Sequence, residues 1–320
     1  MKYLIRILSL WACAGLPLGA HARLNVVATT ADLGALAEAV GGDRVGVLTL
    51  AKPTEDPHFV DAKPSSITKL NRADVLLEGG AELELGWLSP LLEGARNPRI
   101  AAGLPGRISG AAGLTLLEVP ATLDRSKGDL HATGNPHYLN DPVNARIVAQ
   151  HIADVFSQLD PKSADKYRAN FERFAQRLDT KLPEWQQTLA PFRGQHVVSY
   201  HNTWPYFAKR FGLNIDLFLE PKPGIPPTPA HLAEVIGKIK ADGVRVIILE
   251  PYQNRKTADT VAADTGAVVL EFSQYPGGVK GTEGGYLELM DYTVNALAKA
   301  LSQSRVPTRS AAPQERNSRE

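Results

Sequence analysis

The segment LNVVATTADLGALAEAVGGDRVGVLTL, residues 24–50, sets the fold class, because it contains a strand, a helix and a second strand in succession. Residues 24–30 are largely apolar with β-branched side chains, as in a buried strand. Residues 32–40 have the pattern of a helix, which Thr30 can cap and which a pair of glycines ends. Residues 44–50 return to the strand pattern. This succession predicts a parallel sheet with helices packed on its faces.

The same alternation of apolar runs and helical stretches continues toward the C-terminus. Further strands are expected at residues 73–80, 196–200, 214–220, 244–250 and 267–272. Further helices are expected at residues 65–71, 83–92, 203–212, 229–241, 256–265 and 286–301, and another begins near Pro142. Strands that alternate with helices in this way predict an α/β fold of two lobes, each built on a parallel sheet.

A long helix is expected between the two lobes. Its apolar residues recur at intervals of three and four positions, which is the spacing of one helical face: Tyr167, Phe171, Phe174, Leu178, Leu182, Trp185 and Leu189. Asp160 suits the N-cap position and Pro161 the first helical position. Pro183 lacks the amide hydrogen that a helix interior needs, so we expect the helix to kink or end near Leu182. Packed against both lobes, such a helix would oppose a wide hinge motion.

These patterns divide the chain into an N-terminal lobe at residues 23–158, a linking helix at 159–190 and a C-terminal lobe at 191–301. Residues 302–320 are polar and show no periodicity, so they are expected to form a disordered tail. The length suits two domains of ordinary size. The net charge of +1 gives no basis for binding to nucleic acid.

The first 22 residues have the features of a secretory signal peptide. Lys2 and Arg6 provide positive charge, residues 7–20 are largely apolar, and Ala20-His21-Ala22 has the small residues of a cleavage site. We expect cleavage there and export to the periplasm. Cys13 would leave with the signal peptide, so the mature chain could form neither a disulfide nor a thiolate metal site. A lipid anchor at Cys13 is the alternative.

Three histidines stand in loops that are far apart in the sequence: His58 in EDPH, His137 in GNPH and His201 in YHNTW. Two of them follow expected strands, and the carboxyl ends of parallel strands are where ligand sites form in open α/β sheets. A proline directly precedes His58 and His137, and its restricted backbone favours a rigid presentation of the imidazole. Taken alone, any one of these would be interpreted as an ordinary loop histidine. Together they predict a metal site, for which imidazole favours zinc.

Six segments then cover nearly the whole mature chain: VVATTADLGALAEAVGGDRV, EDPHFVDAKPS, NRADVLLEGGAELELGW, DRSKGDLHATGNPHYLNDP, VVSYHNTWPYFAKRFGL and EPKPGIPPTPAHLAEVIGKIK. In this order they resemble the periplasmic zinc- and manganese-binding proteins of ABC importers, which include the ZnuA-like and adhesin-type lipoprotein families. The resemblance implies two (β/α) lobes joined by a long rigid helix, with the metal between them. It also implies ligand roles for His58, His137 and His201, and a membrane ABC permease as the partner.

The chain departs from the family's pattern at the fourth metal ligand, which is often an Asp in the loop after the last strand. Gln274 stands at that place, in LEFSQYPGGVKGT. Its amide oxygen could bind weakly, water could fill the position, or a carboxylate of Glu271 or Glu220 could reach the site. The His-rich loop that zinc members often carry before GNPH is reduced here to a short segment containing His131, which could make an auxiliary contact.

Three histidines without an evident carboxylate favour zinc over manganese, because manganese is better served by carboxylates and water. Zinc requires neutral imidazoles, whose second nitrogens should be held by partners such as Asp56, Asp61 or Glu250. We therefore expect a periplasmic zinc receptor, monomeric and without enzymatic activity, that is served in the periplasm by a metallochaperone. The alternatives are a manganese receptor of the same family, a secreted zinc hydrolase and a surface adhesin.

Overall fold

The computed structural model describes residues 23–122 and 131–303 of the chain. The expected signal peptide lies outside the described residues, as does most of the expected tail. The first two residues of that tail, Ser302 and Gln303, instead complete the last helix, because the apolar face of this helix continues to Leu301. No helix within the described residues is long and apolar enough to cross a membrane.

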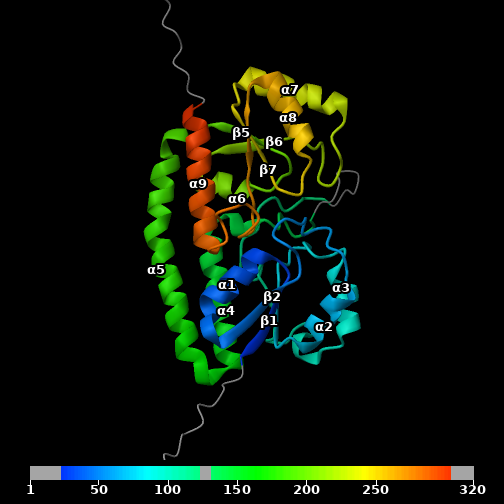
Figure 1. Cartoon of the computed structure of the whole chain (residues 1–320), viewed down its shortest axis with the longest axis vertical. Helices are drawn as coiled ribbons and strands as arrows, with labels where there is room; N and C mark the ends of the chain where they lie inside the picture. Colours follow the sequence, from blue (N-terminus) through cyan, green and yellow to red (C-terminus); the bar gives the residue numbers. More distant parts are fainter. Residues whose placement is uncertain (1–22, 123–130, 304–320) are drawn as a thin grey trace, which may run out of the picture.

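The N-terminal lobe contains a parallel sheet of four strands in the order β2-β1-β3-β4. Its strands are β1 (Leu24–Ala28), β2 (Val45–Thr49), β3 (Val75–Glu78) and β4 (Arg107–Ser109). Helices α1 (Ala31–Gly41) and α4 (Pro142–Leu159) cover one face of the sheet, and α2 (Pro64–Arg72) and α3 (Leu88–Ala95) cover the other (Figure 1). Along β1, Val26 faces the first pair of helices and Val27 the second, which is the alternation of a strand buried on both faces.

The C-terminal lobe repeats this plan with strand order β6-β5-β7-β8, again all parallel. Its strands are β5 (His196–Ser199), β6 (Asn214–Phe218), β7 (Val246–Leu249) and β8 (Val268–Glu271). Helices α7 (Pro229–Asp242) and α8 (Arg255–Thr265) cover the outer face, and α6 (Pro205–Phe211) and α9 (Tyr286–Gln303) cover the inner one. The two-lobed α/β fold expected from the sequence is therefore confirmed.

Helix α5 (Ala164–Leu189) joins the lobes and runs alongside both of them (Figure 1). It packs against α1 and α4 of the N-terminal lobe and against α9, whose Glu288 pairs with Arg177 at 3.0 Å. The expectation that the helix starts at Pro161 was wrong, because residues 161–163 form a separate turn of 3₁₀ helix. The helix also does not end near Leu182: Pro183 lies inside it, and burial of Trp185 and Leu189 offsets the lost hydrogen bond.

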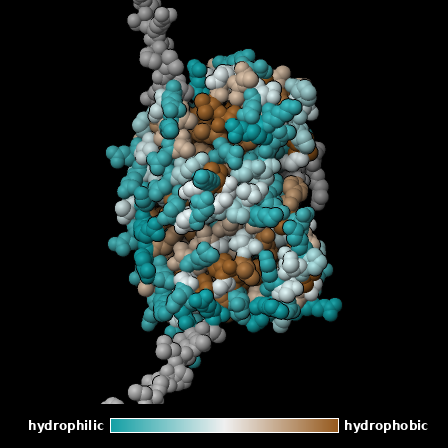
Figure 2. Space-filling view, in the orientation of Figure 1, coloured by the Kyte–Doolittle hydropathy of each residue, from teal (hydrophilic) through white to brown (hydrophobic). Residues whose placement is uncertain are grey.

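One hydrophobic core extends through both lobes. It includes Val26 and Leu36 from the N-terminal lobe, Leu178 from α5, and Phe207 and Val294 from the C-terminal lobe. Two smaller hydrophobic clusters lie on the other faces of the sheets. One is between the N-terminal sheet and helices α2 and α3, and the other is between the C-terminal sheet and helices α7 and α8. The lobes thus share their main core, and a wide opening between them would expose it to water. The surface is mostly hydrophilic in the view of Figure 2, where hydrophobic residues gather in separate patches.

Two elements differ from the sequence expectation. The helix expected at 83–92 begins only at Leu88, because Trp87 before it has φ −139° and ψ −24°, outside the range of a right-handed helix. Strand β4 was not expected, since its three residues are too few to show an alternating pattern. Both differences lie in the N-terminal lobe, between β3 and His137.

Candidate metal centre

The structure brings together the three histidines that the sequence singled out. His58 lies in the loop between β2 and α2, His137 just before α4, and His201 directly after β5. One ligand nitrogen from each ring lies within 4.8 Å of the other two. The ring centroids are 5.4 Å apart for His58 and His137, 5.7 Å for His58 and His201, and 5.3 Å for His137 and His201. The site lies between the lobes, at the carboxyl ends of their strands.

His58 and His137 are held by the same local motif, a polar residue followed by Pro and His. The side-chain Oδ1 of Asp56 accepts hydrogen bonds from the backbone N of His58 at 3.0 Å and from its ring Nδ1 at 2.8 Å. Oδ1 of Asn135 does the same for His137, at 3.0 and 2.8 Å. One oxygen thus fixes both the backbone and the ring of the residue two positions later. The intervening proline restricts the remaining rotation.

This motif also determines the tautomer of each ring. Because the Asn135 oxygen accepts the backbone N–H of His137, the group facing Nδ1 is an acceptor, and Nδ1 must carry the hydrogen. The carboxylate of Asp56 has the same effect on His58. The lone pair of each neutral ring therefore lies on Nε2. Both Nε2 atoms are buried and have no hydrogen-bond partner among the described residues.

His201 is oriented by a carboxylate from the neighbouring strand connection. Its Nδ1 hydrogen-bonds to Oε1 of Glu220, which leaves Nε2 toward the other two rings. Burial opposes the charged form of His201, but the bond to Glu220 and the negative charges of Glu220, Glu250 and Asp56 outweigh it and raise the pKa of the ring. A proton is thus better stabilised on His201 than on His137 or His131.

The other buried rings are kept neutral. Burial, together with the charges of His201, His58 and His131, holds the pKa of His137 well below its usual range. Burial is also the main reason that the pKa of His131 falls to about 4. Burial disfavours the charged form of Asp56, but its hydrogen bonds to His58 prevail and lower the pKa of that carboxyl. Neutral imidazoles backed by acceptors are the state in which histidine binds a metal.

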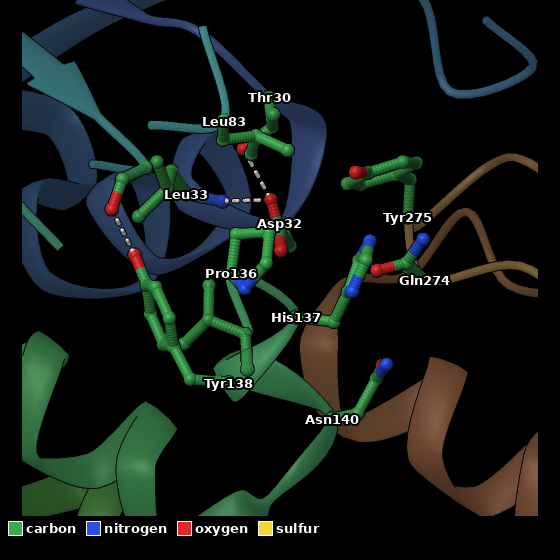
Figure 3. Close-up of a pocket in the computed structure, with 12 residues that line it drawn as sticks. Thr30, Asp32, Leu33, Leu83, Pro136, His137, Tyr138, Asn140, Gln274 and Tyr275 are labelled. Atoms are coloured by element: carbon green, nitrogen blue, oxygen red, sulfur yellow. Dashed lines mark hydrogen bonds between the residues drawn. The ribbon is translucent and has the colours of Figure 1, made fainter. Parts of the chain in front are cut away.

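The residues considered for a fourth contact occupy different places. Gln274 is buried and shares the lining of a small cavity with His137 (Figure 3). Its Nε2 donates to the Tyr252 hydroxyl at 3.2 Å. Glu220 stands behind His201, as a partner of its ring. Glu271 is 42% exposed and pairs with Arg255 at 3.5 Å. The ring of His131 lies 5.3 Å from that of His58.

Of the residues expected to support the ligands, Asp56 does so directly. Glu250 is fully buried and accepts from Trp204 Nε1 at 2.9 Å, so it steadies the segment that follows His201. Asp61 is exposed and is not placed at a ligand ring in the structure. Asn135 was not foreseen in the sequence, although GNPH places it at the same offset from its histidine as Asp56 has in EDPH. That shared offset is the signal that would have identified it.

A cavity of about 250 Å³ connects the site to solvent. His58 and His201 line it together with Asp56, Glu220 and the segment 223–226. His137 is not part of this lining and is 4% exposed. A small ion would therefore reach the three rings from the side of His58 and His201.

Comparison with known proteins identifies relatives along nearly the whole chain. A family model described as zinc-uptake complex component A, periplasmic (ZnuA), matches residues 26–300. The chain is 27% identical over 296 residues to the iron-binding protein YfeA of Yersinia pestis, covering 88% of this chain and 87% of that protein. It is 26% identical over 287 residues to the manganese-binding lipoprotein MntA of Halalkalibacterium halodurans, covering 88% and 89%.

The fold is also similar to solved structures. A crystal structure of ZnuA superposes with a TM-score of 0.74 at 24% identity, over 87% of this chain and 99% of that one. The two lobes and the linking helix thus belong to one architecture that extends across the whole match.

Proposed function

The chain belongs to the ZnuA family, the metal-binding proteins that serve ABC transporters, and from this premise we propose that its cargo is zinc. His58, His137 and His201 bind the ion outside the cytoplasmic membrane, and the protein delivers it to a membrane ABC permease. The reaction is exchange of ligands on the metal. Cleavage of residues 1–22 as a signal peptide, action as a monomer and loading by a metallochaperone are parts of the same proposal.

The observation that carries this proposal is the orientation of the three rings. Each Nδ1 is held by an oxygen, from Asp56, Asn135 or Glu220, and each Nε2 is left for a shared ion. Two of these Nε2 atoms are buried and have no partner within residues 23–122 and 131–303, which costs free energy unless something occupies the space between them. A divalent cation satisfies all three nitrogens at once.

The chemistry of the donors favours zinc over manganese. Imidazoles are neutral when they bind a metal, and the fourth contact that we propose, the Oε1 atom of Gln274, is neutral too. The hydrogen bond from Gln274 Nε2 to Tyr252 supports this role, because it leaves the carbonyl oxygen as the free end of the amide. Imidazole suits zinc, whereas manganese prefers carboxylates and water.

Manganese is the second candidate, favoured by the carboxylate of Glu220 in the wall of the same cavity and by the names of relatives such as MntA. For Glu220 to bind the metal it would have to release His201, whose ring would then lose its orientation. A hydrolase is disfavoured because the family consists of solute-binding proteins.

The test is a competition titration of metal-free protein with zinc and manganese, followed by elemental analysis. We expect one zinc per chain, retained in the presence of excess manganese. His201→Ala should lose the zinc, whereas His151→Ala, which alters a histidine on α4, should keep it. Zinc bound equally tightly by the His201→Ala variant would overturn the assignment. Preferred retention of manganese would mean that the protein is a manganese receptor of the same family.

Exchange of the neutral amide tests the choice of metal more finely. Gln274→Asp introduces the carboxylate that manganese prefers, so manganese affinity should rise about tenfold or more relative to the wild type. Glu271→Asp is the control, since Glu271 is engaged with Arg255. An unchanged preference in Gln274→Asp would mean that residue 274 does not contact the ion.

A further inference from the structure

Two large hydrophobic side chains are exposed in the lining of the cavity that leads to the metal centre, and a third belongs to a segment that contacts the backbone of His58. Phe59 is 64% exposed, Ile225 is 45% exposed, and both line the cavity. Leu85 is 70% exposed and is not part of the lining, but it directly precedes Gly86, where an added Cβ would lie 3.7 Å from the carbonyl oxygen of His58. Phe59 and Leu85 come from the N-terminal lobe and Ile225 from the C-terminal lobe, so the apolar rim spans both.

Position distinguishes these residues from other exposed hydrophobic residues. Leu48 and Val268, for example, are exposed on β2 and β8, away from the lining of this cavity. Isolated exposed apolar residues are normal on a protein surface. An aromatic and an aliphatic side chain in one cavity mouth, with a second exposed aliphatic side chain on a segment that contacts the His58 loop, have the composition of the centre of a protein interface instead.

The shared core limits how the ion can leave. Because one hydrophobic cluster extends through both lobes and α5 packs along them, wide separation of the lobes is costly. The cavity beside His58 and His201 is therefore the short route for the ion, and its acceptor must come to this opening. Asp56 and Glu220 in the cavity wall add negative charge along that route.

We infer that Phe59, Leu85 and Ile225 form the contact surface on which the membrane permease docks. The inference rests on the proposed function, since it assigns the partner's position from the route of the bound ion. Contact with both lobes would seal the opening against water, and contact with Phe59 would act directly on the neighbouring ligand His58. A few such apolar anchors carry most of the binding free energy in protein interfaces.

The test is uptake of radioactive zinc by the native bacterium, with its own gene deleted and the full-length chain supplied from a plasmid. Leu85→Ser/Ile225→Ser avoids the neighbours of the metal ligands. We expect zinc uptake to fall about tenfold, while zinc affinity of the purified variant stays within about twofold. The control is Leu104→Ser/Ile147→Ser, which changes two other exposed aliphatic residues, 46% and 43% exposed, that are not part of this cavity.

Phe59→Ser is added to the Leu85→Ser/Ile225→Ser variant, and zinc uptake should then fall below that of the double variant. Normal uptake with Leu85→Ser/Ile225→Ser, or an equal loss with the control pair, would overturn the docking surface. The zinc titration keeps the two proposals apart. A wild-type chain that binds no zinc refutes the proposed function, whereas a chain that binds zinc and supports uptake without these side chains refutes only the docking surface.

Discussion

The loop that carries His137 and the loop that carries His58 share a motif but differ in how they are attached to the rest of the protein. In residues 134–141 every residue is buried. In residues 52–62 most are exposed or half-buried, and Ala62 and Asp61 face solvent. The comparison indicates that one part of the metal site is built in advance, while the other is the part that can move.

Hydrogen bonds fasten the His137 loop to the C-terminal lobe. Asn140 Nδ2 donates to the carbonyl of Thr203 at 2.9 Å, and the Tyr286 hydroxyl donates to the carbonyl of Leu139 at 2.7 Å. Asp141, the N-cap of α4, forms a bidentate ion pair with Arg210 of α6, with both distances 2.7 Å. His137 is thus fixed relative to His201, although they belong to segments far apart in the sequence.

The His58 loop has far fewer attachments. Among the described residues, the one hydrogen bond from 52–62 to another part of the chain joins the carbonyl of Pro57 to Trp87 Nε1, at 2.8 Å. The others, such as those of Asp56 and Glu55, close within the loop. Regions with few buried contacts open at low free energy. We therefore expect the His58 loop to be the part of the site that opens to admit or release the ion.

The largest effect, on stability, should come from removing the ion pair between Arg210 and Asp141 that holds the His137 loop, here called the brace. Arg210→Met removes the ion pair and leaves Asp141, 12% exposed, without its partner. We expect the metal-free protein to lose about 2 kcal/mol of unfolding free energy, because the surviving carboxylate stays half-desolvated. Chemical denaturation measures it. The control is Arg255→Met, whose pair with Asp259 is 54% exposed on both sides and should matter little. Equal losses of unfolding free energy in the two variants would mean that the Arg210–Asp141 pair does not stabilise the His137 loop.

The second effect concerns the proton that competes with zinc at His201. The raised pKa of His201 means that zinc affinity should be lost as pH falls through a value above 6.5, where the ring takes up a proton. Glu220→Gln removes the carboxylate charge, so the loss should move to lower pH, and affinity at high pH should fall about tenfold. Zinc titrations between about pH 5 and pH 9 test this. An unshifted pH midpoint would contradict it, and Glu271→Gln is the control.

The smallest effect should come from the single anchor of the His58 loop. Trp87→Phe keeps an aromatic ring but removes the hydrogen bond to Pro57, worth about 1 kcal/mol. Zinc should dissociate about fivefold faster, as stopped-flow measurements with a chelator would show. Trp185→Phe makes the same chemical change on α5, where Nε1 donates to Asp291 at 2.7 Å, and should leave the rate unchanged. Similar rates in the two variants would mean that Trp87 does not restrain the loop.

The sequence predicts one loop better than the other, for physical reasons. The strands and the long helix are visible because apolar spacing reflects burial, and the three histidines are visible because their motifs are local. The role of Asp56 is also local, since the motif contains it. The ion pair between Arg210 and Asp141 cannot be predicted from the sequence, because the two residues meet only through the packing of α6 against the start of α4. Glu220 was foreseen near the metal, but its bond to His201 depends on strand order.

The most direct test of this asymmetric site is amide hydrogen exchange of the protein with and without zinc. We predict that zinc slows exchange mainly in residues 52–62. Residues 134–141 should already be protected in the metal-free protein, because their bonds to the C-terminal lobe do not depend on the ion. Fast exchange in residues 134–141 without zinc, slowed on binding as much as in residues 52–62, would contradict the account.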